Sequence, residues 1–432
     1  MRRAFLYSWM AGFTTDMTRV SELTRQSQAR QSQARLSDAA AHAGQAAPGI
    51  LLDEDRLAWL ALTLAPGLGP RRILEAMRQL ETPSQIFELP LTAIESLKFP
   101  AGASHYIFDG KARAAAEREW AAVCEQGVGL VTFGCAQYPE RLKEIYDPPP
   151  VLWVRGDAEL LARPSIAIVG TRHPTPYGTG MAELLARDLA ARGMLIVSGM
   201  ARGVDSAAHK GALAARQPTL AVWGTGADVI YPKENKKLAE DILASGGAIV
   251  SELPLGTFPA PQNFPRRNRI LSGVSLGVLV VEASENSGTR VTARCAADQG
   301  RDVFAVPGNV TNKNSWTPNT LIKQGAQLTA TWEDVWEVLP SQVRLELEAG
   351  WPSESKSSAS ASLLPDAGPG ALGANEAILL EVLRQDTALQ IDEILELCET
   401  QLTSSEVFTA LFELELAGRI RSLPGKNYVR GF

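Results

Sequence analysis

Short, almost continuous apolar runs alternate with amphipathic segments between about residues 165 and 338. Six runs stand out: SIAIVG, MLIVSG, TLAVWG, AIVSEL, LGVLVVEA and VFAVPG. Strands that are apolar throughout are typical of parallel sheets covered on both faces, and the segments between the runs have the pattern of crossover helices. The pattern therefore predicts an α/β fold, a doubly wound domain with a mainly parallel sheet.

The residues before this region follow a helical period instead. From Asp53 onward, the stretch LAWLALTLAPGLGPRRILEAMRQL predicts a helix, a tight turn over Pro66 to Gly69 and a second helix. That second helix opens at Pro70, and proline is favoured in the first turn of a helix. We interpret this region as a helix-hairpin-helix domain.

The two ends of the chain differ from both regions. The start is rich in Ala, Gln, Ser and Arg and lacks the large apolar residues that offset ordering entropy, whereas Ser, Ala, Pro and Gly dominate after Trp351. From Asn375, three helical patterns precede two short strands, which is typical of a winged-helix module. We expect a disordered tail at 1–50, a helical domain at 51–118, the α/β domain at 119–340, a flexible linker at 341–374 and the winged-helix module at 375–432.

Composition places the chain among ordinary globular proteins. Of its 432 residues, 45% are hydrophobic and 21% are charged, which excludes a collagenous or mainly disordered chain. Four cysteines lie far apart without metal-type spacing, so we expect free thiols, a reducing compartment, no metal and no cofactor. No apolar run approaches the ~20 residues of a membrane span. We therefore expect a cytoplasmic protein that does not bind membranes.

The net charge of −6 argues at first against nucleic acid, whose phosphates attract basic surfaces. The charge is unevenly distributed, however. Residues 1–164 hold 18 basic and 19 acidic side chains, residues 165–340 hold 17 and 15, and residues 341–432 hold 7 and 14. The acidic excess thus belongs mainly to the linker and the winged-helix module, and the α/β domain is near neutral.

Ligands of doubly wound sheets bind at the carboxyl ends of the strands, so the residues after each apolar run are the candidates. Glycines at these turns let backbone amides approach an anion, although any one glycine could equally serve a tight turn. Arginines at several strand ends would add a multi-phosphate site. The candidate residues are Gly170, Thr171, Arg172, Gly199, Arg202, Gly203, Phe264, Arg267, Asn268, Arg269, Ser287, Gly288 and Thr289.

Motifs of common enzymes are missing from these turns. The sequence has neither the dinucleotide fingerprint after Gly170 nor a Walker A loop, and no HExxH or Ser-His-Asp order is present. We expect His209 to pack in the fold and Asp205 to be a helix N-cap. Phe264 beside three arginines favours binding of a single-stranded nucleic acid by stacking, although a place in the core is equally compatible with a phenylalanine.

Five stretches together strongly resemble the DNA-processing protein A (Smf) family: IAIVGTRHPTPYG, VSGMARGVDSAAHKGAL, YPKEN, FPRRNRILSGVS and VVEASENSGTRVTARCAADQGRDVFAVPGNV. The resemblance covers about Asp53 to Asp334. It implies an extended Rossmann-like domain that binds single-stranded DNA without catalysis, usually as a homodimer. It also implies that the protein protects incoming DNA and loads a RecA-type recombinase during natural transformation.

The resemblance also assigns roles to single residues. It implies that Arg172, with Thr171 beside it, Phe264, Arg267 and Arg269 contact DNA. The same comparison implies that Gly199, Arg202 and Gly203 shape the neighbouring turn, with Gly199 and Arg202 counted among the DNA-binding residues, and that Asn268 fixes its loop. The turns that would support a phosphate contain Gly170, Gly203, Asn268 and Ser287-Gly288-Thr289.

Two other functions remain open at this point. A nucleotide-binding Rossmann-like enzyme, such as a nucleoside-monophosphate phosphoribohydrolase, would need a carboxylate near the sugar, and Glu282 and Asp298 are the candidates. Glu282 could instead cap its loop. A purely structural scaffold would leave the basic edge unexplained. The winged-helix module, with five basic and ten acidic residues from Asn375 on, is predicted to contact protein or to regulate.

Overall fold

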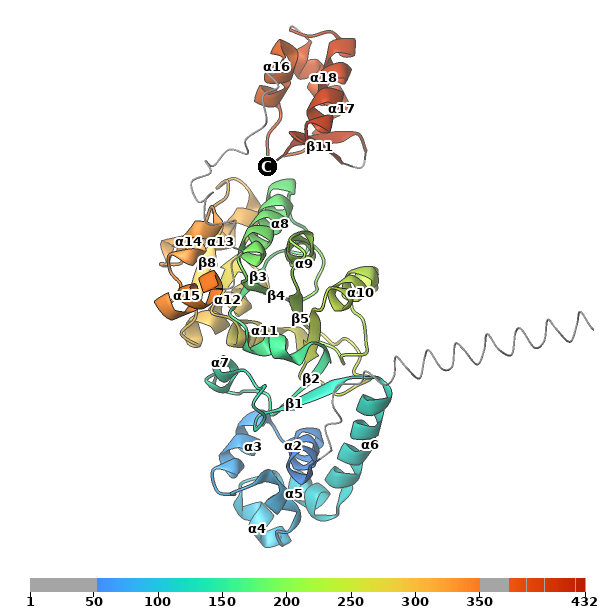
Figure 1. The fold of residues 1–432 in the computed structure, drawn as a ribbon, viewed down its shortest axis with the longest axis vertical. Helices are drawn as coiled ribbons and strands as arrows, with labels where there is room; N and C mark the ends of the chain where they lie inside the picture. The colour runs from blue at the N-terminus through green and yellow to red at the C-terminus, as the bar shows by residue number, and fades with distance from the viewer. Residues whose placement is uncertain (1–52, 350–372, 386, 400, 424, 432) are drawn as a thin grey trace, which may run out of the picture. The chain divides into compact units, whose positions relative to one another are not determined.

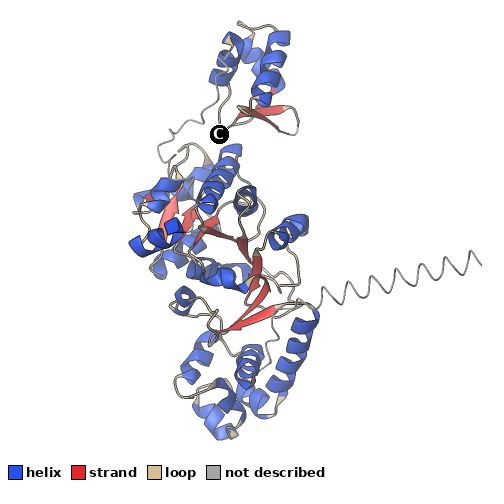
Figure 2. Cartoon of the chain, in the orientation of Figure 1, coloured by secondary structure: helices blue, strands red, loops and turns tan. Residues whose placement is uncertain are grey.

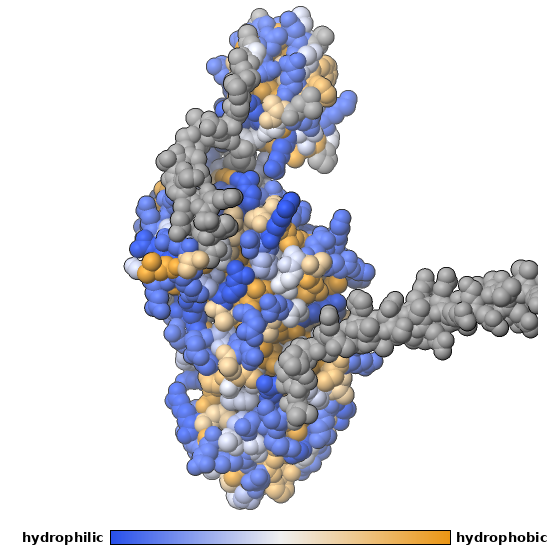
Figure 3. Space-filling model, viewed as in Figure 1, coloured by the Kyte–Doolittle hydropathy of each residue, from blue (hydrophilic) through white to orange (hydrophobic). Residues whose placement is uncertain are grey.

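The computed structural model describes residues 53–349, 373–385, 387–399, 401–423 and 425–431. The predicted disordered tail and the predicted linker from residue 350 to 372 lie outside the described residues. Figure 1 traces the described elements along the chain, and Figure 2 separates helices from strands. On the face drawn in Figure 3, hydrophilic residues cover most of the surface and hydrophobic residues show in smaller patches.

Within the described ranges, the α/β part holds one nine-stranded sheet with the order β1-β2-β6-β5-β4-β3-β7-β8-β9. Strands β3 to β9 run parallel, and β1 and β2 extend one edge in antiparallel fashion. The chain moves outward from β3 to β6 and then crosses back to β7. The point where this order reverses, between β3 and β7, is where such sheets bind ligands. The strands are β1 Gly129–Thr132, β2 Val151–Gly156, β3 Ser165–Val169, β4 Leu195–Ser198, β5 Thr219–Val222, β6 Ala248–Ser251, β7 Gly277–Val280, β8 Asp302–Ala305 and β9 Gln327–Leu328.

Helices cover both faces of this sheet, which confirms the predicted doubly wound, mainly parallel fold. Alternate residues of each strand enter different cores: Ile166 and Ile168 of β3 pack with helices of one face, Ala167 and Val169 with helices of the other. This alternation explains why the strands are apolar throughout. The first face carries α8 Pro176–Ala191 and α9 Val204–Ala214, and the second carries α11 Asn263–Val274 and α12 Thr289–Asp298. The other helices of this part are α7 Glu140–Lys143, α10 Lys236–Ala244, α13 Trp316–Lys323, α14 Trp332–Trp336 and α15 Ser341–Ala349.

The helical region before the sheet contains the predicted hairpin. Helix α2 (Glu54–Leu64) buries Leu57 and Leu60, and the following turn places Gly67 at a φ of +76°. Glycine adopts this left-handed conformation without the strain a side chain would add. Helix α3 (Pro70–Met77) then begins at the proline, as predicted. The remaining helices are α4 Leu91–Ser96, α5 Ala101–Phe108 and α6 Lys111–Glu125.

The C-terminal elements form the predicted winged-helix fold around a separate apolar core. A capping box at Thr403 and Glu406 begins its longest helix. Three short strands pair in the order β10-β12-β11. The elements are α16 Ala374–Val382, β10 Leu389–Gln390, α17 Ile391–Cys398, α18 Ser404–Leu416, β11 Ile420–Leu423 and β12 Asn427–Arg430.

One stretch differs from its expected structure. The first nine residues of the predicted linker form α15, because Val343 and Leu347 lie one helical turn apart and are buried in the core of the first face. The prediction relied on composition and overlooked this apolar pair. The other domain boundaries stay predictions. None of the helices in the described ranges is long and apolar enough to cross a membrane.

Candidate nucleic-acid interface

A groove of about 720 Å³ lies at the carboxyl ends of the parallel strands, over the reversal point between β3 and β7. The turn after β3, the first turn of α11 and the start of α12 form its walls. Nine of the thirteen candidate residues line it: Gly170, Thr171, Arg172, Phe264, Arg267, Asn268, Ser287, Gly288 and Thr289. Segments more than a hundred residues apart in the sequence therefore meet at one site.

Phe264 lies in the first turn of α11 and is half-buried. Its ring packs over Gly224 at the end of β5, where an added Cβ would lie only 2.9 Å from the ring. The ring of Tyr231 lies beside it, with 5.4 Å between centroids, and also lines the groove. Tyr231 is 40% exposed. Together these two rings offer an aromatic surface on which an unpaired base can stack.

Sequence reasoning missed the second ring of this pair. Tyr231 opens the YPKEN stretch that follows β5, and an aromatic residue after a strand end was a signal available from the sequence. The same stretch also braces the neighbouring turn. Asn235 donates from Nδ2 to the carbonyl of Met200, at 2.8 Å, and to the hydroxyl of Ser206.

Arg172 is the exposed arginine of the groove. The turn that carries it is fixed, since the Thr171 amide donates to the carbonyl of Glu282 at 2.6 Å. Among the described residues, no carboxylate lies within ion-pair distance of the Arg172 guanidinium. Its charge is therefore available to an external anion.

Arg267 points inward, in contrast to the direct DNA contact expected of it. Only 5% of the residue is exposed, and Nη1 donates to the carbonyl of Gly199 at 2.8 Å and to that of Val222. Gly199 allows this approach, because an added Cβ would lie 2.3 Å from Nη1. Burial lowers the pKa of Arg267 to about 10, while Asp205 raises it. Arg267 is thus a floor residue of the groove that ties α11 to the ends of β4 and β5.

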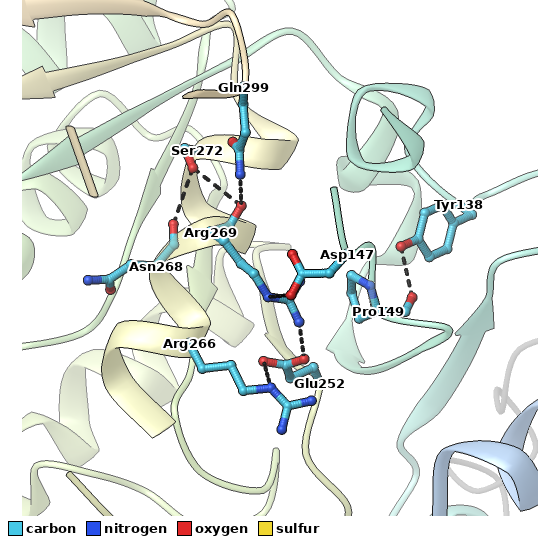
Figure 4. Close-up of polar contacts among 9 residues, drawn as sticks. All are labelled: Tyr138, Asp147, Pro149, Glu252, Arg266, Asn268, Arg269, Ser272 and Gln299. Atoms are coloured by element: carbon cyan, nitrogen blue, oxygen red, sulfur yellow. Dashed lines mark hydrogen bonds and ion pairs between the residues drawn. The ribbon is translucent and has the colours of Figure 1, made fainter. Parts of the chain in front are cut away.

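Arg269 is also internal, and it does not line the groove. Its guanidinium pairs with Glu252 after β6 and with Asp147 before β2, the latter at 3.2 Å (Figure 4). Arg266 shares Glu252 from the exposed side, at 3.2 Å. Burial raises the pKa of Glu252, and the two arginines lower it. Arg269 thus belongs to a buried ion network, and the DNA contact expected of it stays a prediction. The side chain of Asn268 points away from this network (Figure 4).

The other turn residues lie next to the groove. Arg202 is exposed and pairs with Glu234 of the YPKEN stretch. Gly203, with a φ of +77°, is the N-cap of α9, a place we had expected Asp205 to fill. Asp205 is instead the second residue of the helix, where it is buried, lines the groove and accepts from the Ala201 amide. Burial raises its pKa, and Arg267 lowers it.

The start of α12 brings a helix N-terminus to the groove. Gly288 is exposed, and the Thr289 amide donates to the Ser287 hydroxyl at 3.2 Å. The positive end of the helix dipole at this point favours an anion. Arg290 faces the other way, since it donates to the carbonyl of Glu285 and lies over the ring of Trp316.

The carboxylates considered for catalysis are engaged elsewhere. Glu282 is buried and accepts from the amide and hydroxyl of Thr175, at 2.8 and 2.6 Å, so it caps the start of α8. Asp298 lies at the end of α12 and pairs with Arg294. Neither carboxylate lines the groove. In the described ranges, no cluster of three or more His, Cys, Asp or Glu residues could hold a metal ion.

His209 packs inside the fold, as predicted. It is fully buried, and its Nδ1 lies 2.8 Å from the hydroxyl of Thr219. Burial lowers its pKa to about 3, with a further contribution from the nearby Arg267 charge. A neutral imidazole enclosed in this way serves the packing of α9 on the sheet.

An open, mostly parallel sheet with an aromatic and basic groove at its reversal point defines a Rossmann-like protein that binds a phosphate-bearing ligand. The model of the DNA recombination-mediator protein A family matches residues 129–340, and that of the DprA winged helix domain matches residues 364–426. The chain belongs to the DNA processing protein A (DprA/Smf) family, and its role is in DNA processing.

Individual relatives agree with this assignment. Protein Smf of Escherichia coli is 43% identical over 305 residues, which cover 68% of this chain and 75% of that protein. DNA processing protein DprA of Bacillus subtilis is 44% identical, over 52% of this chain and 76% of that protein. The X-ray structure of DNA processing protein A from Streptococcus pneumoniae superposes with a TM-score of 0.59 at 33% identity, over 67% of this chain and 99% of that one.

Proposed function

We propose that this protein binds single-stranded DNA in the groove, protects incoming DNA and loads a RecA-type recombinase on it during natural transformation. In this proposal it acts as a homodimer in the cytoplasm and catalyses no reaction. The observation that carries the DNA-binding part is the meeting of Phe264, Tyr231 and Arg172 at one groove. Recombinase loading and dimer formation extend the proposal from the family resemblance.

The aromatic pair explains the preference for a single strand. In a duplex, each base is stacked between its neighbours, so its faces are not accessible to a protein ring. An unpaired base can lie on Phe264 or Tyr231, while the Arg172 guanidinium binds an adjacent phosphate and the positive end of the α12 helix dipole favours its charge. Such binding tolerates many sequences, because every base has an aromatic face.

A gel-shift comparison of single-stranded and duplex oligonucleotides tests this proposal. We expect a clear preference for the single strand and a strong decrease of affinity with salt. Phe264→Ala should lower the affinity roughly tenfold through the loss of a base stack. Arg172→Ala should reduce the slope of log affinity against log salt by about one, because one phosphate contact is lost.

Arg294→Ala is the matched control, since this side chain is 83% exposed on α12 and does not line the groove. It should leave both affinity and salt slope close to those of the unaltered protein. Equal affinity for single strand and duplex, or no binding to either, would contradict the proposal.

A further inference from the structure

Tyr146 is an exposed aromatic residue outside the groove, in the loop between α7 and β2. The residue is 72% exposed, although both of its neighbours in the sequence are anchored. Ile145 is buried beside Gly273 of α11, and Asp147 pairs with Arg269. The loop is therefore held on the protein at both sides of a ring that stays in solvent.

An arginine already lies against this ring. The guanidinium carbon of Arg71 is 4.6 Å from the Tyr146 ring centroid, and Arg71 also donates a hydrogen bond to the tyrosine hydroxyl. Arg71 belongs to the first turn of α3, directly after the hairpin turn of the helical region, and Arg72 beside it is exposed. The Tyr146 ring thus has a cation against it and is otherwise exposed to solvent. An unpaired base can stack on the exposed part of such a ring while the cation attracts the neighbouring phosphate.

The ion network of α11 connects this ring to the groove. Phe264 and Arg269 are five residues apart on the same helix, which corresponds to a rise of about 7.5 Å. Arg269 pairs with Asp147, the residue next to Tyr146, and with Glu252 (Figure 4). Arg266 shares Glu252 and is 49% exposed, so α11 also presents a positive side chain two residues after Phe264. The buried network thus joins α11, the helix that carries Phe264, to Asp147, the neighbour of Tyr146 in the sequence.

We propose that Tyr146 and Arg71 form a second stacking site for the same single DNA strand, beyond the groove. A strand whose bases stack on Phe264 and Tyr231 continues past Arg266 and places a further base on Tyr146. Arg71 and Arg72 take the neighbouring phosphates. This inference rests on the proposed function, since it concerns the path of the strand that the groove binds.

The contact between Arg71 and Tyr146 has a simpler explanation, in which it only ties the helical region to the α/β domain. The two explanations differ in how the effect depends on strand length. A tie uses both the tyrosine hydroxyl and the contact of the ring with Arg71, so its loss in Tyr146→Ala would change the binding of short and long strands alike. A stacking site uses the exposed part of the ring, so its loss would change only the binding of a strand long enough to reach it.

Fluorescence anisotropy with oligo-dT of two lengths tests the proposal on the full chain. An oligonucleotide of about six nucleotides occupies the groove alone, whereas one of about twenty-five also reaches the second site. We expect Tyr146→Ala to lower the affinity for the long strand roughly tenfold and to leave that for the short strand unchanged. Tyr146→Phe should bind both like the unaltered protein. Arg71→Ala should reduce the salt slope for the long strand by about one.

Phe108→Ala is the control, because this residue is 54% exposed on α5 of the same helical region, and among the described residues no arginine lies against its ring. Photocross-linking of a halogenated oligo-dT to the unaltered protein gives a readout that needs no variant. We expect the peptide with Tyr146 to be cross-linked by the long strand only.

An equal effect of Tyr146→Ala on both lengths, or none on either, overturns the second site, as does a cross-link pattern without Tyr146. Failure of the proposed function itself has a different signature. In that case the unaltered protein binds neither oligonucleotide.

Discussion

A group of ionisable side chains lies buried beneath the groove, and His209 shows its electrostatics best. The Thr219 hydroxyl donates to the carbonyl of Ile196 at 2.7 Å, so its oxygen is left to accept from Nδ1 of His209. The imidazole is therefore neutral with its proton on Nδ1. Burial disfavours the charged form and lowers the pKa from 6.5 to about 3.

This residue makes stability depend on pH in a defined direction. In the unfolded chain His209 binds a proton near pH 6.5, whereas in the folded protein it stays neutral down to about 3. Between these values the unfolded state holds more protons, so the free energy of unfolding falls as the pH drops below 6.5. The slope approaches about 1.4 kcal/mol per pH unit.

His209→Gln keeps a polar partner for Thr219 and removes the titration. Denaturant unfolding between about pH 7.5 and pH 5 should show a shallower loss of stability for this variant than for the unaltered protein. The buried carboxylates are common to both proteins, so the difference between the two curves isolates His209. Parallel curves would show that the imidazole is not shielded from protonation.

At the scale of elements, α11 is the part on which the groove depends. Its first turn carries Phe264, and two buried guanidiniums hold the helix in place. Arg267 connects it to the ends of β4 and β5, and Arg269 to the end of β6 and the loop before β2. The orientation of the Phe264 ring is therefore set by bonds formed deeper in the same helix.

The position of α11 at the groove could be predicted from the sequence, whereas the contacts of its arginines could not. Apolar runs mark the strands, and the residues after a strand must come to the carboxyl edge of the sheet, so Phe264 and Arg172 were predicted at the groove. The direction in which a helical side chain points does not follow from composition. Arg267 donates to the carbonyls of Gly199 and Val222, and Arg269 donates to Glu252; these partners lie 68, 45 and 17 residues away in the sequence.

Tyr146 and Tyr231 were missed for a related reason. Both lie in loops without a periodic pattern, and their exposure results from how neighbouring residues are anchored. The spacing of apolar residues in the sequence does not show how the neighbours of these two tyrosines are held in the fold. The helix-hairpin-helix turn was predictable because Gly67 and Pro70 act locally, within one turn of chain.

Replacing Arg267 distinguishes an internal tie from a DNA contact. Arg267→Met leaves the Asp205 carboxylate buried without its cation, and we expect the free energy of unfolding to fall by about 3–5 kcal/mol. Adding Asp205→Asn should recover part of this loss, because the uncompensated charge is then removed. Arg266→Met on the same helix is the control, with an expected cost of about 0–1 kcal/mol. A stable Arg267→Met protein with weakened DNA binding would instead favour a direct contact.

At the scale of the whole molecule, the α/β region and the winged-helix module differ in net charge, and this difference indicates different binding partners. The α/β region carries two more basic than acidic residues and presents Arg172 in its groove, whereas the winged-helix module carries five more acidic than basic residues. The module also exposes Leu397 on α17 and Phe408 and Phe412 on α18, each by more than half. Exposed apolar side chains surrounded by acidic ones are better suited to contact another protein than to bind phosphates. This agrees with the protein-contact or regulatory role that we predict for the module.

Removal of residues 350–432 tests this division in the binding assay. The module adds negative charge, and its repulsion of DNA is screened over about 10 Å at 0.1 M salt, so we expect the affinity for oligo-dT to change by no more than about twofold. The salt slope should stay the same, because no phosphate contact is lost. Arg172→Ala should reduce binding by the same factor in the truncated and the full chain. A tenfold loss of affinity with a shallower salt slope on truncation would show that the winged-helix module contacts the strand itself.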